Sequence, residues 1–231
     1  MESEEEQKDE HQLRICCISD NTFFEYCSES NTFSKKSISQ PLGEFFGFTN
    51  ISKNSFLISG GQSDYISTNT TLLLELNESS LTTRPLKSMF DKKHNHTLVL
   101  YTHSQALSLG GMVEDGETEE AEILSTCEMY NESKDEWIEI SRLQEKKCNV
   151  GAACVDDHVY VFGGMDQHEL CVNQIELWDG DQWKFLSFEG EWNPICDCAC
   201  VLLGNRLSYL EEAMIRMKGI IVCALIWRTE K

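Results

Sequence analysis

Short apolar runs alternate with polar turns along nearly the whole chain, and many of the turns are rich in Gly, Asn, Asp and Ser. Runs of this kind predict β-strands, because successive side chains of a strand point to opposite faces. One order recurs: an apolar strand, a second strand that ends in a glycine pair, a polar loop, a third strand, a turn and a last strand. The pattern therefore predicts an all-β chain made of repeats.

The repeat is most complete over Val150–Trp183, and its markers keep a nearly constant period. The glycine pairs begin at Gly60, Gly110 and Gly163, which are 50 and 53 residues apart. The place of an aromatic marker in the last strand is taken by Phe33, Thr83, Trp137 and Trp183. Two independent markers with one period of roughly 50 residues indicate a four-stranded propeller blade. We expect the glycines to let a neighbouring backbone approach closely, and the tryptophans to fill the space between blades.

These markers resemble those of the kelch-repeat family, whose blades carry an apolar strand, a Gly-Gly pair, a Tyr or Asp at a later strand end, and a tryptophan. The matching positions are Gly60, Gly61, Gly110, Gly111, Gly163, Gly164, Tyr130, Trp137 and Trp183. The resemblance implies a kelch-type β-propeller. Since propellers of this family close with about six blades, this one is predicted to be partial. It would have about three complete four-stranded blades plus incomplete terminal blades.

The same markers divide the chain. Residues 1–12 are predicted to be an acidic, disordered N-terminal tail, and residues 13–210 the propeller. The predicted blade units are 13–41 (partial), 42–91, 92–145, 146–190 and 191–210 (partial). Residues 211–231 form an atypical C-terminal tail.

That tail departs from the repeat where the next glycine pair should stand, because the chain has Glu211-Glu212 there. One hypothesis is that residues 211–231 are the out-of-frame translation of a lost blade. The alternative is a genuine cap with a helix at 209–217 and a strand at 219–227. An arc of blades that does not close would leave unpaired edges, through which the chain could self-associate.

Composition narrows the range of partners. The formal net charge of −20 is spread along the chain, which argues against binding nucleic acid or an anionic membrane surface. The longest apolar run, residues 219–227, is too short to cross a bilayer. The N-terminus has no secretion signal, so we expect a cytoplasmic protein whose 11 cysteines are reduced thiols.

Few residues suggest a metal site or catalysis. Cys196, Cys198 and Cys200 would share one face of a strand, but small residues are also needed where blades pack. His94 and His96 could meet a metal, although a solvated loop is the simpler interpretation. No signature for nucleophilic, phosphate-binding or zinc-protease chemistry occurs. We therefore expect no catalytic residues, no metal, no cofactor and no enzymatic activity.

The kelch resemblance implies a protein-interaction module, a scaffold or adaptor that binds its partner through loops on one face. The loops after the glycine pairs contain the candidate binding residues Asp64, Tyr65, Glu114, Asp115, Glu117, Asp166, Gln167 and His168. The acidic loop from residue 114 to 122 could recognise a basic peptide, or simply be solvated. The resemblance suggests cytoskeletal or ubiquitin-ligase partners; the ligase role would need an N-terminal part that this sequence does not contain. The alternatives are a kelch-like enzyme acting on a small molecule or sugar, and a decayed gene fragment.

Overall fold

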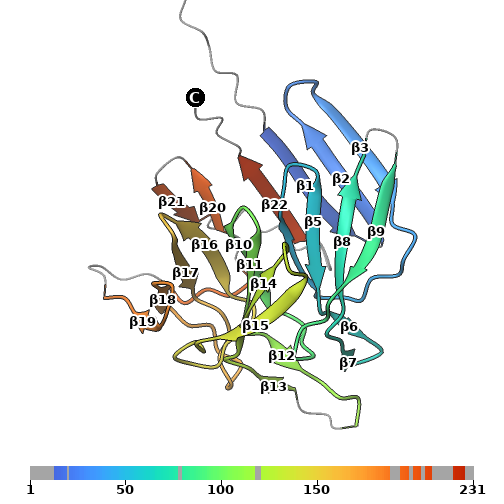
Figure 1. The fold of residues 1–231 in the computed structure, drawn as a ribbon. Helices are drawn as coiled ribbons and strands as arrows, with labels where there is room; N and C mark the ends of the chain where they lie inside the picture. The colour runs from blue at the N-terminus through green and yellow to red at the C-terminus, as the bar shows by residue number, and fades with distance from the viewer. Residues whose placement is uncertain are drawn as a thin grey trace, which may run out of the picture.

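A computed structural model of the 231-residue chain describes residues 13–19, 21–77, 80–117, 121–187, 193–197, 200–203, 206–209 and 221–226. Every regular element in these ranges is a β-strand, and the strands form small sheets arranged around an axis (Figure 1). The predicted all-β fold and the propeller architecture are confirmed.

Four of the sheets have four antiparallel strands each, and we number them as blades in chain order. Blade 1 consists of β22 (Ile221–Ile226), β1 (Leu13–Ser19), β2 (Thr22–Cys27) and β3 (Thr32–Ser37). Blade 2 consists of β4 (Gly47–Asn50), β5 (Ser55–Ser59), β8 (Thr71–Leu76) and β9 (Leu81–Leu86). Blade 3 consists of β10 (Thr97–Thr102), β11 (Gln105–Leu109), β14 (Cys127–Asn131) and β15 (Glu136–Ile140). Blade 4 consists of β16 (Gly151–Val155), β17 (His158–Phe162), β18 (Ile175–Trp178) and β19 (Trp183–Phe185).

The remaining sheets have two strands. Blade 5, as far as it is described, is the pair β20 (Cys200–Leu203) and β21 (Arg206–Tyr209). Two hairpins extend the loops after the first two glycine pairs: β6 (Gln62–Ser63) with β7 (Ile66–Ser67), and β12 (Met112–Val113) with β13 (Glu122–Ile123).

The C-terminal tail supplies a strand that the repeat pattern did not predict. β22 pairs antiparallel with β1 and completes blade 1, so the described residues contain four four-stranded blades instead of three. The innermost strands lie side by side in the order β4, β10, β16, β20, β22, which brings the two ends of the chain together. β22 coincides with the strand expected at 219–227 in the alternative description of the tail. Residues 211–212, where the out-of-frame hypothesis places a glycine pair, lie outside the described residues.

Backbone hydrogen bonds link successive blades at the start of their inner strands. Phe45, Asn95, Asn149 and Asp197 all have positive φ, between 52° and 55°. The N–H of Asn95 donates to the carbonyl of Phe45 at 2.9 Å, that of Asn149 to Asn95 at 2.9 Å, and that of Asp197 to Asn149 at 3.0 Å. This chain of bonds fixes blades 3, 4 and 5 each to the blade before it.

The glycine pairs hold the connection to the next blade, as the sequence predicted. In each pair the N–H of the second glycine donates to a carbonyl of the connection to the next blade. Gly61 donates to Lys93 at 2.9 Å, Gly111 to Lys147 at 2.9 Å, and Gly164 to Ile195 at 2.8 Å. A Cβ on the first glycine of each pair would lie only 2.2–2.3 Å from that same carbonyl oxygen. The three pairs therefore perform one task at three places: they let the connecting backbone pass against the end of the second strand.

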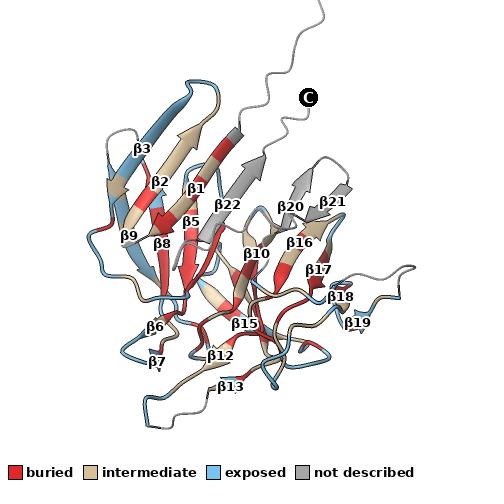
Figure 2. Cartoon of the chain, turned by 180° about the vertical axis from the view of Figure 1, so that it is seen from behind, coloured by how far each residue is buried: buried red, intermediate tan, exposed pale blue. Residues whose placement is uncertain are grey.

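Tryptophans fill the space between blades, which also confirms the prediction. Trp137 of blade 3 donates from Nε1 to the carbonyl of Lys87 in blade 2 at 3.0 Å, and Trp183 of blade 4 donates to the carbonyl of Ser141 in blade 3 at 3.0 Å. Both indoles are buried in the cores between the blades. Buried residues gather on the inner strands, whereas β3 on the outer edge of blade 1 is largely exposed (Figure 2).

Candidate functional site

The loops after the glycine pairs of blades 2 and 3 lie side by side at one end of the propeller, at the bottom of Figure 1. Ile66 forms an antiparallel bridge with Asp115, and the N–H of Ser67 donates to the carbonyl of Glu114 at 2.9 Å. The structure thus brings five of the predicted residues together. We call the exposed side chains of Asp64, Tyr65, Ile66, Asp115 and Glu117 the joined-loop surface.

Tyr65 is the most prominent side chain of this surface. It occupies the two-residue turn between β6 and β7 together with Asp64, and both residues have positive φ (50° and 62°). Hairpin turns with two left-handed residues favour Asn, Asp and Gly, so a tyrosine there is uncommon. Its side chain is nevertheless 77% exposed. A large aromatic ring is therefore held in solvent on a short, hydrogen-bonded turn, where it contributes nothing to a core.

Buried polar groups beneath the surface fix the two loops together. The hydroxyl of Ser67 accepts from the N–H of Glu114 at 2.8 Å and lies 2.9 Å from Nδ1 of His94. Gln62 also hydrogen-bonds through Nε2 to the carboxylate of Glu114. Glu114, predicted as a binding residue, is thus engaged in joining the loops. Ile66, which the sequence did not indicate, is 45% exposed beside Tyr65.

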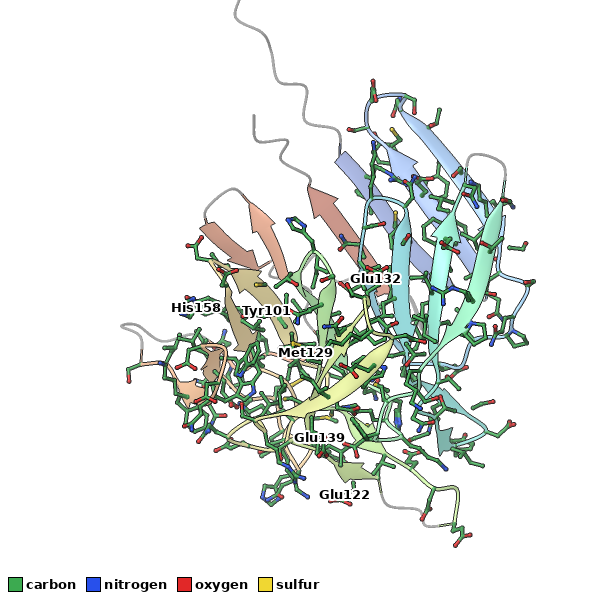
Figure 3. The ribbon with its side chains drawn as sticks, in the orientation of Figure 1. Tyr101, Glu122, Met129, Glu132, Glu139 and His158 are labelled. Carbon is green, nitrogen blue, oxygen red and sulfur yellow. A yellow bond between two sulfur atoms is a disulfide. The ribbon has the colours of Figure 1, made fainter. Side chains whose placement is uncertain are left out.

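The joined-loop surface is acidic. Its exposed charged residues, Asp64, Asp115 and Glu117, are all negative, and residues 62–67 and 112–117 contain no Lys or Arg. Glu122 on β13 adds a further carboxylate near the same end of the molecule, where it pairs with Lys146 at 2.8 Å (Figure 3). An exposed aromatic ring on the same surface as carboxylates is suited to a basic partner.

The blade 4 loop forms a separate, self-contained turn. The carboxylate of Asp166 accepts the backbone N–H groups of His168 and Leu170 at 2.8 and 3.0 Å, and these bonds lower the pKa of Asp166. Gln167 and His168 are exposed on this turn. Asp166 therefore shapes its own loop, whereas Gln167 and His168 remain predicted binding residues.

His94 and His96 are buried, so the solvated-loop interpretation of this pair is wrong. They are 2% and 5% exposed. Nε2 of His96 lies 2.9 Å from the hydroxyl of Ser59, as His94 lies against Ser67. Desolvation lowers the pKa of His94, and it lowers that of His96 well below the ordinary value, with the nearby charge of Lys93 adding to the effect at His96. Both serines belong to blade 2, so the histidines join blade 2 to blade 3.

Acid is expected to weaken the fold through His96. The unfolded imidazole takes up a proton near pH 6.5, while the folded one stays neutral, so the free energy of unfolding should fall as pH decreases from about 7 to 5. In His96→Val, which copies Val150 at the equivalent position of blade 4, this decrease should be shallower. Urea unfolding at a series of pH values measures it, with exposed His103→Gln as the control. Equal slopes in all three proteins would contradict this assignment.

The cysteines differ from the expectation of reduced thiols in one place. Cys171 and Cys196 are joined by a disulfide that connects the end of the blade 4 loop to the start of blade 5. Cys196 lies outside a strand, since β20 begins only at Cys200. Cys198 and the side chain of Cys200 lie outside the described residues, so the predicted shared face is not tested. In the described ranges, no group of three or more His, Cys, Asp or Glu side chains could hold a metal ion.

Comparison with known proteins agrees with this architecture. The family model for the kelch motif matches residues 146–187, which span the glycine pair and Trp183 of blade 4. Residues 146–187 therefore carry a kelch motif, within a propeller of the kelch type. Similar proteins include the kelch repeat and BTB domain-containing protein 1 of cowpox virus (strain Brighton Red) and of vaccinia virus (strain Copenhagen). Each is 26% identical over 65 residues, which are 28% of this chain and 12% of the viral protein.

A solved structure, that of YjhT, shares the fold. It superposes with a TM-score of 0.60 over 72% of this chain and 52% of YjhT, at 10% sequence identity. At this identity the likeness shows the propeller fold alone. Within the part of the chain that the structure describes, no helix is long and apolar enough to span a membrane.

Proposed function

We propose that this kelch-type propeller is a non-enzymatic scaffold or adaptor that binds a basic segment of a partner protein through the joined-loop surface. The observation that carries the proposal is Tyr65, an aromatic ring held 77% exposed in a left-handed turn among carboxylates. Backbone strain that a fold maintains without gaining core packing is a feature of binding sites. Kelch repeats and the kelch-containing names of the viral relatives support a protein-interaction module in general.

The chemistry of the surface defines the segment that it would bind. Tyrosine and arginine are enriched at the centres of interfaces, and an arginine side chain can stack on an aromatic ring while it pairs with a carboxylate. Asp64, Asp115 and Glu117 offer such carboxylates on the same surface as Tyr65. A partner segment with Arg or Lys next to an apolar residue would match both Tyr65 and Ile66. A cytoplasmic location, and a cytoskeletal or ubiquitin-ligase partner, belong to the same proposal.

Tyr65→Ala is expected to weaken binding of such a segment about tenfold or more, because a central interface tyrosine typically contributes over 1 kcal/mol. The probe is a displayed library of random 12-residue peptides selected on the full chain, followed by titration of the selected peptides. Phe33→Ala, which removes a 67% exposed aromatic ring from β3 on another part of the molecule, is the matched control.

Charge provides the second readout. Selected peptides should be basic, and their affinity should fall with added salt and in the triple variant Asp64→Asn, Asp115→Asn, Glu117→Gln. Selection of neutral or acidic peptides would refute the proposal. So would binding that Phe33→Ala weakens as much as Tyr65→Ala does.

A further inference from the structure

One pair of positions recurs where the loop of a blade meets the connection to the next blade. The loop member comes just before the residue whose N–H donates to the carbonyl of the second glycine, at 2.8–2.9 Å. The connection member comes just after the residue whose carbonyl accepts the N–H of that same glycine. The pairs defined in this way in blades 2, 3 and 4 are Ser67 with His94, Ile123 with Cys148, and Cys171 with Cys196.

The three pairs differ in chemistry. The hydroxyl of Ser67 lies 2.9 Å from Nδ1 of His94. Ile123 and Cys148 are 6% and 0% exposed, and Cys148 is a free thiol. Of the three pairs, only that of blade 4 is covalent. Blades 2 and 3 keep the same backbone arrangement without a disulfide, so the fold itself does not require one at this position.

The disulfide stands where the buried ion pair of the other two connections cannot form. The carbonyls that accept from the glycine pairs belong to Lys93, Lys147 and Ile195. Each of the two lysines forms a buried ion pair with a glutamate of the following blade. Isoleucine at the equivalent position has no charge to pair. The next residue, Cys196, connects the two blades instead through its bond to Cys171.

The disulfide lies near the surface of the molecule. Cys171 and Cys196 are both half-buried, and their neighbours in sequence, Leu170 and Asp197, are exposed. In contrast, Cys148 is 0% exposed, and burial raises the pKa of its thiol to about 12. Thiol–disulfide exchange needs a thiolate that can reach a sulfur of the disulfide. The blade 4 pair is therefore suited to exchange, whereas Cys148 is not.

The disulfide also closes the exposed loop of blade 4. Residues 167–170 are exposed, and Cys171 at the end of the loop forms an antiparallel bridge with Met165 at its start. Without the covalent bond, this end of the loop depends on backbone hydrogen bonds such as that from Val172 to Gly164 at 2.9 Å. Segments held by near-surface hydrogen bonds open more readily than a core does. Loss of the disulfide should therefore loosen the loop.

We propose that Cys171 and Cys196 form a reversible redox site, which a small thiol opens and the corresponding small disulfide closes, and which controls how firmly the blade 4 loop is attached to blade 5. Disulfides in the cytoplasm, the location proposed above, are usually of this transient kind. The inference is independent of the joined-loop surface, which belongs to blades 2 and 3.

Opening consumes two molecules of a thiol such as glutathione. The first, as a thiolate, attacks one sulfur and forms a mixed disulfide, while the other cysteine leaves as a thiolate and takes up a proton. The second attacks the glutathione sulfur of the mixed disulfide and releases the remaining cysteine together with glutathione disulfide. The protein disulfide is thus reduced and two glutathione thiols are oxidised; closing reverses these steps.

The first measurement titrates the full chain with mixtures of reduced and oxidised glutathione, followed by acid quenching, alkylation and mass spectrometry. The peptides with Cys171 and Cys196 should pass from linked to alkylated as the proportion of reduced glutathione rises. Hydrogen exchange at residues 165–171 should become at least tenfold faster after reduction, and the melting temperature should fall by roughly 5–10 °C. Residues 112–117, in the equivalent loop of blade 3, are the internal control and should not change.

The double variant Cys171→Ser, Cys196→His copies the pair Ser67 with His94 of blade 2. Its loop exchange should no longer respond to glutathione. Cys148→Ala is the matched control, because it removes the thiol at the equivalent position of the previous connection and should keep the response of the unmodified chain. If the histidine variant does not fold, Cys171→Ser with Cys196→Ser replaces it.

Each of four results would overturn the proposal. Alkylation of both cysteines in excess oxidised glutathione would show that no disulfide forms. A link that persists in excess reduced glutathione would show that it is not reversible. Unchanged exchange at residues 165–171 after reduction would show that the disulfide does not control the loop. A full response to glutathione in the double variant would assign that response to other cysteines.

Discussion

Gly110→Ala is expected to destabilise the propeller by about 4 kcal/mol, enough to lower the melting temperature by roughly 10 °C. An alanine Cβ at this position would lie 2.2 Å from the carbonyl oxygen of Lys147. That carbonyl accepts the N–H of Gly111 and belongs to the connection between blades 3 and 4. Because the overlapping atom is a backbone oxygen, a side chain cannot simply rotate away. The connection at Lys147 must move, and its hydrogen bond from Gly111 must break. Thermal and urea unfolding measure the effect.

Gly180→Ala separates this overlap from simple backbone preference. Gly180 also has positive φ, 98° against 56° at Gly110, but the nearest atom to its Cβ would be the hydroxyl of Tyr101 at 3.8 Å. Its substitution should therefore cost only the strain of a left-handed alanine, about 1–2 kcal/mol. Equal losses in the two variants would show that the glycine pair is required for its φ angles and not for close approach.

The repeat markers predicted the fold well because each one reports a local requirement that recurs. Gly110 and Gly163 need the same closeness to a connecting carbonyl, and Trp137 and Trp183 fill the same space between blades. Such requirements repeat with the period of the blade, so they are visible in the sequence. β22 has no such marker. Its pairing with β1 joins residues about 200 positions apart, and nothing local in residues 221–226 indicates it.

The candidate site was predicted only as a set of loops. Sequence position indicated Tyr65 and Asp115, but the bridge between Ile66 and Asp115 depends on how blade 2 sits against blade 3. The same dependence explains the error at His94. A histidine in a connection resembles a solvated residue until Ser67, 27 residues earlier, is placed beside it. Polar residues whose partners belong to another blade carry no periodic signal that identifies those partners.

Charged residues show most clearly that sequence alone does not identify partners in other elements. Two lysines in the connections between blades, Lys93 and Lys147, are completely buried. Lys93 pairs with Glu128 of β14 at 3.1 Å, and Lys147 pairs with Glu176 of β18 at 2.7 Å. The carboxylates also accept backbone N–H groups, Phe90 at Glu128 and Gln144 at Glu176. Blade 2 has Gly43 and Leu72 at the equivalent positions, so a blade can be built without the pair.

Glu176→Leu is expected to destabilise the protein by about 3–5 kcal/mol, because it leaves the ammonium group of Lys147 buried without a counter-charge. In the double variant Glu176→Leu, Lys147→Met, most of this loss should be recovered, since an apolar pair of similar size avoids the unpaired charge. The free energy of unfolding in urea, measured for both single variants and the double variant, gives the coupling between the two residues.

Lys146 provides a control one residue away. It pairs with Glu122 at 2.8 Å, a distance close to that of the buried pair, but the two side chains are 45% and 64% exposed. Glu122→Gln should therefore change stability by no more than the measurement error, because water and salt screen an exposed pair. If Glu176→Leu were equally harmless, Lys147 would have to reach solvent in the folded protein. If the double variant stayed as unstable as Glu176→Leu, the loss of stability would come from the backbone N–H of Gln144, which loses its acceptor on Glu176, and not from the buried charge of Lys147. Burial, and not the separation of the charged atoms, decides which ion pair this propeller requires.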